Sequence, residues 1–559
     1  MKTLVVAWPW LAAICSGVLY AFCFAPFNLT WFCWIALTPL IAAIWFSGTE
    51  SRHPWLRRML LGYIAGLTFF WIVFSWLTTV TVLGWFVLQF YMAMYFAIWA
   101  WFCDLLRPRA PNKRKRHAAS KWDQMLVQAR SAALPSVQSP WTKSTSNLRL
   151  AFILAAAWTA LEWLRGWVFS GFGWNGLGVA LHDNWPLIQV TEFTGVPGLS
   201  FIVAFANVIV VTTAYRLVVE ARTRVMRPHF DFTVTMAAIV GVLIFGIRAT
   251  QVSPTTKPLR VAAVQSNIPQ NQKFDPEFTR RIFDQFRRLS EIALRSNPPP
   301  DLLVWPESSM PGPVLADEES RKFVMDLAAS SETDLLLGTI DVDKQNVYNA
   351  ALLISDGGDR IQVYRKVHLV PFGEFVPGRH TVPLLAKIVG DQVPGDFKGG
   401  NEYTVFTLTD SNTHVAPLIC FEDTIGELTR QFVLPSETSP GANVLVDVTN
   451  DGWFERSAGS HQHLANAIFR SVETRRPMIR AANTGVTCFI NQFGRITQIL
   501  RDDTGSTFTE GVLAGEIKVP TEPELTFYVR HGELFAKACA AITLVSILLL
   551  FAVRRWKRA

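Results

Sequence analysis

Charged residues are scarce in this chain of 559 residues, since Asp, Glu, Lys and Arg together make up only 17% of it. Hydrophobic residues make up 50% and aromatic residues 13%, and the mean hydropathy is +0.24. These values are far from the average composition of soluble proteins, and the chain is too long for one small domain. The composition therefore argues against a wholly soluble protein and predicts a large membrane part.

Cysteine is scarce as well. The seven cysteines include no Cys-x-x-Cys motif and no zinc spacing, and five of them lie in or beside apolar runs, where packing is the ordinary role. Cys420 and Cys488 lie elsewhere and could form a disulfide, but Cys488 belongs to a strand-like run, so we expect free thiols. His461 and His463 lack a third clustered ligand. We therefore expect no metal site and no cofactor.

Long apolar runs are the main feature that the chain does have. Each is close to the ~20 residues that cross ~30 Å of hydrocarbon. The first run follows Lys2 and resembles a signal peptide, but its length and the runs that follow it predict an uncleaved helix. We predict eight transmembrane helices, at roughly 4–24, 31–47, 59–80, 84–105, 150–169, 197–219, 233–249 and 534–553.

Lys and Arg are absent from alternate short loops between these runs. None occurs in 25–30, 81–83 or 170–196, whereas the other loops and the C-terminal tail are basic. Because loops rich in Lys and Arg stay in the cytoplasm, both termini are predicted to be cytoplasmic. The block 250–533 must then face outward.

The chain thus divides into three parts. Residues 1–249 form a membrane domain of seven helices with a cytoplasmic basic loop at 106–149, residues 250–533 form the outward domain, and residues 534–559 form the eighth helix and a cytoplasmic tail. The outward domain carries a net charge of −9 and the remainder +17. The basic residues therefore meet anionic lipid, and we expect a membrane partner and no nucleic acid.

The pattern changes between 258 and 520. Short β-branched runs such as LRVAAVQSNI and ANVLVDVTND alternate with amphipathic stretches such as PEFTRRIFDQFRRLSEIALR. Continuous apolar strands with intervening amphipathic helices indicate an α/β domain whose sheets are covered by helices.

Three residues at the ends of such runs could form a nucleophilic site. Glu307 follows DLLVWP, Lys366 follows VYR and Cys420 follows APLI. A carboxylate can deprotonate a thiol, and a cation can stabilise the thiolate and later an oxyanion. His368 is the rival of Lys366, because a Cys–His pair is also common chemistry.

Further charged residues accompany these three. Glu374 and Glu422 lie near the same strand ends, and Glu422 follows Cys420 by two, so it is expected on the same side of a strand, where it could tune the thiol. In the membrane domain, Glu162 and Arg165 lie three apart on one helical face. They either pair as ions or contact a lipid headgroup, since charge is costly at that depth.

The motifs resemble those of a known family. VWPES, RKVHLVPFGEFVP and LICFED are similar to the Glu, Lys and Cys motifs of the nitrilase, or carbon–nitrogen hydrolase, superfamily. With flanking spans and with FCFAPF, LEWLRGWVFSGF, VQSNIPQNQKFD and NDGWF, nearly the whole chain resembles the apolipoprotein N-acyltransferase family, apart from a longer loop at 106–149. The resemblance implies an αββα sandwich on a polytopic membrane domain of eight helices.

The resemblance also implies a reaction, the last step of bacterial lipoprotein maturation at the periplasmic side of the cell inner membrane. A phospholipid, typically phosphatidylethanolamine, donates its sn-1 acyl chain to the cysteine, and the α-amine of a diacylated apolipoprotein accepts it. By motif, Glu307 is the general base, Lys366 the oxyanion stabiliser and Cys420 the nucleophile. Further positions that match the family are Glu374, Glu422 and Asn349.

Two positions depart from the family pattern. Phe274 follows Lys273 where the family often has Trp, and Phe421 follows the nucleophile where it often has Tyr. Both remain aromatic, so packing or acyl contacts can survive, whereas a role for a tyrosine hydroxyl cannot. The apolar segment 375–400 is a candidate lipid-facing lid.

Two other functions are compatible with parts of this pattern. A membrane-tethered nitrilase or amidase would use the same three residues with water as acceptor, so the triad alone does not separate it from an acyltransferase. A non-catalytic lipid-binding scaffold is disfavoured by the intact Glu, Lys and Cys set. The membrane motifs favour the acyltransferase.

Overall fold

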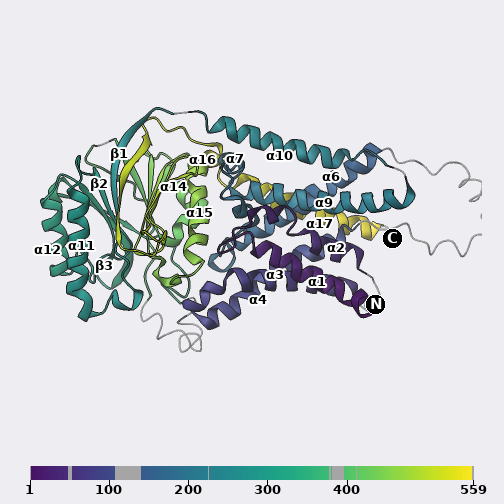
Figure 1. The fold of residues 1–559 in the computed structure, drawn as a ribbon, viewed down its shortest axis with the longest axis horizontal. Helices are drawn as coiled ribbons and strands as arrows, with labels where there is room; N and C mark the ends of the chain where they lie inside the picture. Colours follow the sequence, from purple (N-terminus) through teal and green to yellow (C-terminus); the bar gives the residue numbers. More distant parts are fainter. Residues whose placement is uncertain are drawn as a thin grey trace, which may run out of the picture.

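The computed structural model describes most of the chain, as a helical bundle and a two-sheet domain stacked end to end (Figure 1). Most of the predicted loop 106–149 and of the predicted lid 375–400 lies outside the described residues. The described ranges are 2–47, 53–107, 140–224, 226–252, 254–376, 379, 396–410, 412–437 and 439–556.

The helical bundle brings the two ends of the chain together. The last helix returns to the bundle formed by the first 249 residues, and both chain ends lie at the end of the bundle away from the sheets (Figure 1). The bundle helices are α1 (Lys2–Ala21), α2 (Thr38–Phe46), α3 (Pro54–Val73), α4 (Val82–Leu105), α6 (Pro140–Arg165), α9 (Val196–Thr223), α10 (Phe230–Ala249) and α17 (Leu534–Trp556).

Among the described residues, five helices are long and apolar enough to cross a membrane, namely α3, α4, α9, α10 and α17. The predicted spans at 4–24 and 31–47 correspond to the shorter apolar helices Ala7–Ala21 and Thr30–Phe46. Helix α6 covers most of the predicted span at 150–169, since it ends at Arg165, and it begins in polar sequence around Lys143. The chain is therefore a membrane protein, and the total of eight crossings stays a prediction.

The first sheet has the strand order β12-β1-β2-β3-β4-β5. Its central strands β1, β2 and β3 are parallel, and the remaining pairs are antiparallel. The strands are β1 (Thr256–Gln265), β2 (Leu302–Trp305), β3 (Asp334–Asp343), β4 (Asn346–Ser355), β5 (Arg360–Arg365) and β12 (Gly511–Pro520).

The second sheet repeats this plan with the order β11-β10-β9-β8-β7-β6. Strands β7, β8 and β9 are parallel, with antiparallel strands on both sides. The strands are β6 (Phe406–Thr407), β7 (His414–Ile419), β8 (Val444–Thr449), β9 (Met478–Ala482), β10 (Cys488–Ile490) and β11 (Ile496–Ile499). The carboxyl ends of the parallel strands are where ligands bind in such sheets.

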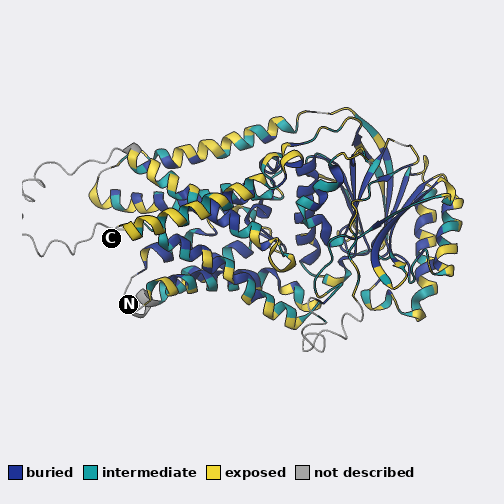
Figure 2. Ribbon diagram, turned by 180° about the vertical axis from the view of Figure 1, so that it is seen from behind, coloured by how far each residue is buried: buried dark blue, intermediate teal, exposed yellow. Residues whose placement is uncertain are grey.

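Helices cover the outer face of each sheet, which gives the expected αββα sandwich (Figure 1). Helices α11 (Thr279–Leu294) and α12 (Glu318–Ala329) cover the first sheet, and α14 (Gly426–Val433) and α15 (Gly459–Thr474) cover the second. Helix α11 buries one apolar face, as amphipathic surface helices do. Helix α15 is instead buried nearly all round, because it lies between the second sheet and the bundle (Figure 2).

The two parts share one hydrophobic core. A single cluster of buried apolar side chains runs from Val446 of β8 through Ile468 of α15 to Trp174 and Leu177 of the bundle. Burial of apolar surface is the main favourable term in such an association. The α/β domain is therefore seated on the bundle and not merely tethered to it.

Candidate active site

The three residues predicted from the motifs lie at strand ends of both sheets. Glu307 follows β2 and Lys366 follows β5 in the first sheet, and Cys420 follows β7 in the second. Glu307 and Lys366 are buried, and Cys420 is half-buried. The structure thus brings together, between the two sheets, a carboxylate, an amine and a thiol that lie more than fifty residues apart along the chain.

Cys420 occupies a sharp turn. Strand β7 ends at Ile419, and Cys420 begins a short 3-10 helix, Cys420–Thr424, with a backbone φ of +53°. A residue with a side chain rarely adopts positive φ, and such strain persists only where the surroundings hold it. The turn lifts the thiol off the strand, as a nucleophile elbow does.

The side chain of Glu307 accepts a hydrogen bond at only one of its two oxygens among the described residues. The side-chain nitrogen of Asn349 donates to Glu307 Oε1 at 2.7 Å and to Glu374 Oε1 at 2.6 Å. Glu307 Oε2 is buried and has no hydrogen-bond partner among the described residues. A buried oxygen without a partner is costly, and here it is available to take a proton.

Lys366 is a buried cation with a carboxylate partner. Its Nζ lies 3.0 Å from Glu374 Oε1, and Glu374 Oε2 accepts from the backbone nitrogen of Val370 at 2.7 Å. Burial alone would lower the pKa of Lys366, but the charges of Glu374 and Glu307 outweigh it and raise that pKa. Lys366 therefore stays protonated at neutral pH.

The thiol experiences both charges. Burial raises the pKa of Cys420 well above its ordinary value; Glu307 raises it further, whereas Lys366 lowers it. The resting state is thus a thiol and not a thiolate. Such a thiol needs a base during attack, which the unpartnered oxygen of Glu307 can supply.

His368, the rival of Lys366, lies in a different position. Its ring stacks on Phe421 with the ring centroids 5.8 Å apart, and its Nε2 is buried with no partner among the described residues. Burial and the charge of Lys366 lower the pKa of His368, so the ring is neutral. Lys366, and not His368, contacts Glu374, which favours Lys366 as the cationic member.

The expectation that Glu422 projects from a strand beside Cys420 was wrong. The strand ends before Cys420, so Glu422 lies inside the 3-10 turn, where it is fully buried. Burial raises the pKa of Glu422 to about 7. It accepts hydrogen bonds at 2.8–3.0 Å from the hydroxyl of Tyr364 and the backbone nitrogens of Val367, His368 and Ile419. Glu422 therefore joins the Lys366 segment to the Cys420 turn.

Lys273 is a site residue that sequence reasoning missed. Its Nζ donates to the backbone oxygen of Glu307 at 2.6 Å, and the side chain is buried. Burial lowers the pKa of Lys273 to about 8. The residue stood in the motif VQSNIPQNQKFD, but nothing in the linear pattern brought it to Glu307. Its neighbour Phe274, by contrast, is 49% exposed.

An aromatic wall links the nucleophile to the bundle. Phe421 stacks on Phe172 and Trp174, at centroid distances of 6.0 and 6.1 Å. Trp174 is itself buried. Phe421 therefore fills its family position by ring contacts, which need no hydroxyl.

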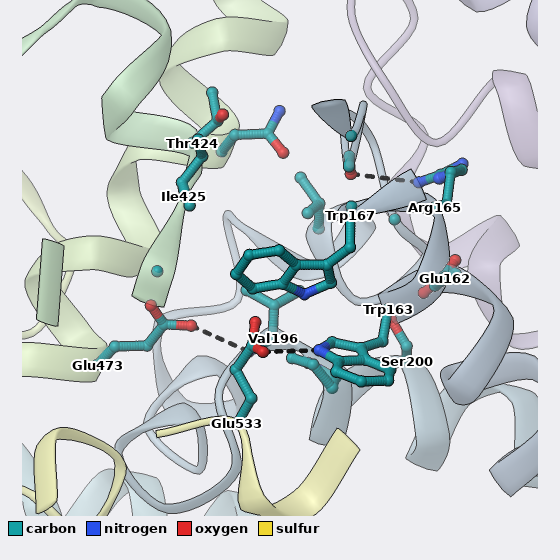
Figure 3. A pocket seen from close by; sticks show the side chains of 18 of the residues that line it. Glu162, Trp163, Arg165, Trp167, Val196, Ser200, Thr424, Ile425, Glu473 and Glu533 are labelled. Atoms are coloured by element: carbon teal, nitrogen blue, oxygen red, sulfur yellow. Dashed lines mark hydrogen bonds between the residues drawn. The ribbon is translucent and has the colours of Figure 1, made fainter. Parts of the chain in front are cut away.

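A cavity of about 140 Å³ lies between the bundle and the Cys420 turn (Figure 3). Its lining includes Phe421, Arg165 and three carboxylate residues, Glu162, Glu473 and Glu533. Trp163 Nε1 donates to Glu533 Oε2 at 2.7 Å, and the backbone nitrogen of Val196 donates to Glu473 Oε1 at 3.1 Å.

Glu162 and Arg165 do not form the ion pair considered from the sequence. Glu162 Oε1 accepts from the backbone nitrogen of Leu177 at 2.7 Å, and Arg165 Nη2 donates to the carbonyls of Gly173 and Trp174 at 3.2 and 3.0 Å. The two side chains instead hold the loop that follows α6.

Two family models match the chain. Residues 16–209 match the apolipoprotein N-acyltransferase N-terminal domain, and residues 260–523 match carbon–nitrogen hydrolase. Among solved structures, a carbon–nitrogen hydrolase from Helicobacter pylori is 16% identical, with a TM-score of 0.35, over 50% of this chain and 95% of its own.

Curated relatives match over nearly the full length. The apolipoprotein N-acyltransferase of Bradyrhizobium diazoefficiens is 28% identical over 99% of this chain and 96% of its own. That of Geobacter metallireducens is 32% identical over 95% of this chain and 93% of its own. With both family models matched in order and relatives that span both parts, the chain belongs to the apolipoprotein N-acyltransferase family.

Proposed function

We propose that this protein transfers the sn-1 acyl chain of a phospholipid, by way of a thioester on Cys420, to the α-amine of the diacylated N-terminal cysteine of an apolipoprotein. The donor is phosphatidylethanolamine, and the α/β domain acts at the periplasmic face of the cell inner membrane. The family membership supports the transfer to lipoproteins. The observation that supports this site is the position of Cys420. It lies on a strained turn, near a side-chain oxygen of Glu307 that has no hydrogen-bond partner among the described residues and near the ammonium group of Lys366.

In the first half-reaction, Cys420 Sγ attacks the carbonyl carbon of the sn-1 ester while Glu307 Oε2 takes the thiol proton. Lys366 donates to the oxyanion that forms. When the intermediate collapses, the carbon–oxygen bond to glycerol breaks, and Glu307 gives the proton to the leaving oxygen. The products are the thioester and a lysophospholipid.

In the second half-reaction, the neutral α-amine of the apolipoprotein attacks the thioester carbonyl. The carbon–nitrogen bond forms, the carbon–sulfur bond breaks, and Glu307 passes the proton of the amine to the leaving sulfur. Because Cys420 holds one acyl group at a time, the lysophospholipid leaves first and the kinetics are ping-pong.

The position of the site supports acyl transfer over hydrolysis by a tethered amidase. The turn that carries Cys420 faces the aromatic wall of Phe172 and Trp174 in the bundle, next to the source of acyl chains. An apolar wall also keeps water from the thioester while the second substrate arrives.

The test separates these two functions. Purified protein is given phosphatidylethanolamine alone, and lysophospholipid is counted against enzyme. We expect about one equivalent and then arrest, with turnover restored by a diacylated lipopeptide. Continuous release without lipopeptide would mean a lipase or amidase. Cys420→Ala serves as the control and is expected to release none.

A further inference from the structure

A buried ionic cluster, which the proposed mechanism does not use, lies behind the nucleophile. Its members are at most 1% exposed and come from five different elements. Ionisable groups so deeply buried are costly unless they are paired well, and they are weak devices for stability. The cluster consists of Asp423 of the Cys420 turn, Asp447 of β8, Asp451 of the 3-10 turn Asp451–Phe454, His463 of α15 and Arg480 of β9.

Asp423 joins the cluster to the nucleophile. It lies in the same 3-10 turn as Cys420, three residues later. Its Oδ1 lies 2.8 Å from His463 Nε2, and its Oδ2 lies 3.7 Å from Arg480 Nε. The backbone that gives Cys420 its positive φ is thus tied through one side chain to a helix and to a strand.

His463 and Arg480 also contact the other two carboxyl groups of the cluster. Asp451 Oδ1 lies 3.0 Å from His463 Nδ1 and 3.1 Å from Arg480 Nη2, and Asp451 Oδ2 lies 3.1 Å from Arg480 Nη1. Arg480 Nε lies 3.2 Å from Asp447 Oδ2. Both cations therefore have fixed positions, with the carboxyl groups on opposite sides of them.

His463 and Arg480 lie among three carboxyl groups, which act on their ionisation. Burial would lower the pKa of His463, but Asp423 outweighs it and raises that pKa to about 10. Burial and the neighbouring Asp423 raise the pKa of Asp447 well above its usual range. The 2.8 Å contact between His463 and Asp423 is therefore an ion pair that involves a protonated imidazole.

The residue next to His463 anchors the same helix to the bundle. Gln462 Oε1 accepts from Trp76 Nε1 at 3.0 Å and from Trp174 Nε1 at 3.2 Å. Gln462 Nε2 donates to the carbonyls of Ala25 and Val73 at 2.8 and 3.0 Å. One turn of α15 therefore contacts both the membrane helices and, through His463, the nucleophile turn.

We propose that Asp423 and His463 are positioning residues that hold Cys420 in its reactive conformation, and that α15 makes this conformation depend on the seating of the α/β domain on the bundle. The inference rests on the proposed function, since it concerns the same thiol. A strained turn persists only where its surroundings hold it, and the ion pair on Asp423, the fourth residue of the turn, provides such a constraint. A displacement of the thiol of about 1 Å would cost about a hundredfold in rate.

The experiment uses the burst of lysophospholipid from the full-length protein with phosphatidylethanolamine alone. The amplitude of the burst counts correctly folded enzyme, whereas its rate constant reports the geometry at Cys420. We expect His463→Leu to lower the rate constant at least about tenfold with a KM for phospholipid within about twofold of the original. His463→Gln keeps a nitrogen near the position of Nε2 and is expected to recover most of the rate.

His461→Leu is the matched control, since this neighbouring histidine on the same helix is exposed, and it is expected to leave the rate constant unchanged. If His463→Leu does not fold, Asp423→Asn, which has nearly the same shape, is expected to show the same slower burst. A smaller amplitude with an unchanged rate constant in the folded variant would reduce the cluster to a structural role and overturn the inference. Absence of any burst in the unsubstituted protein would instead refute the proposed function.

Discussion

The side chain of Asn349 donates to Oε1 of Glu307 at 2.7 Å and so determines which oxygen of that carboxylate is free. The same nitrogen also donates to Glu374, which contacts Lys366. One amide thus fixes the position of the base relative to that of the cation. Both carboxylates share this one donor, and preorganisation of this kind is what acid–base and electrostatic catalysis need.

The first prediction concerns the nucleophile. After exposure to phospholipid alone, mass spectrometry is expected to find one acyl adduct on the peptide that contains Cys420, because this thiol alone adjoins Glu307 and Lys366 among the described cysteines. Cys420→Ser is expected to abolish transfer. Cys488→Ser is the control and is expected to keep it, since Cys488 is a buried strand residue. An adduct on Cys488 would refute the assignment.

The second prediction separates the two candidate cations. Lys366→Ala is expected to lower the rate of acyl transfer by roughly the 10²–10³-fold that accompanies loss of one oxyanion donor. His368→Ala is expected to cost much less, since its ring contacts Phe421 and not Glu374. Steady-state rates of the two variants, measured side by side, provide the check. The opposite ranking would favour a Cys–His pair.

The third prediction concerns the pKa of the thiol. Burial and Glu307 raise the pKa of Cys420 and Lys366 lowers it. Glu307→Gln is therefore expected to lower this pKa while acyl transfer is lost, and Lys366→Met is expected to raise it further. The measurement is the ultraviolet absorbance of the thiolate as a function of pH, taken as a difference from Cys420→Ala. A thiol pKa that Glu307→Gln leaves unchanged would remove Glu307 from the site.

The fourth prediction concerns topology. A membrane-impermeant thiol label is expected to reach a cysteine introduced at an exposed position of the α/β domain, such as Asp503, only from the periplasmic side. A cysteine introduced in the loop 106–149 is expected to react only from the cytoplasmic side, because that loop is rich in Lys and Arg. Labelling of the loop from outside would invert the proposed orientation and exclude lipoprotein maturation.

Much of the architecture could be predicted from the sequence, because its signals are local. The span lengths, the alternation of basic loops and the switch to short apolar strands each depend on neighbouring residues, and they yielded the membrane part and an α/β domain covered by helices. The αββα sandwich followed only from the resemblance to the family. The motifs likewise identified Glu307, Lys366 and Cys420 as residues at strand ends. The sequence alone did not decide between Lys366 and His368. The two residues are two positions apart, so alternation along a strand places both on the same face.

Tertiary structure decided the rest, for a physical reason in each case. Glu422 does not lie in a strand, because the strand ends where Cys420 takes a positive φ. That backbone conformation depends on contacts from other elements. Lys273 reaches Glu307 only through the packing of distant segments. The partners of His463 come from three separate elements, so no spacing along the chain could reveal them. Sequence by itself determined the kinds of element and the chemistry at their ends, whereas the orientation and burial of each charged group came from long-range packing.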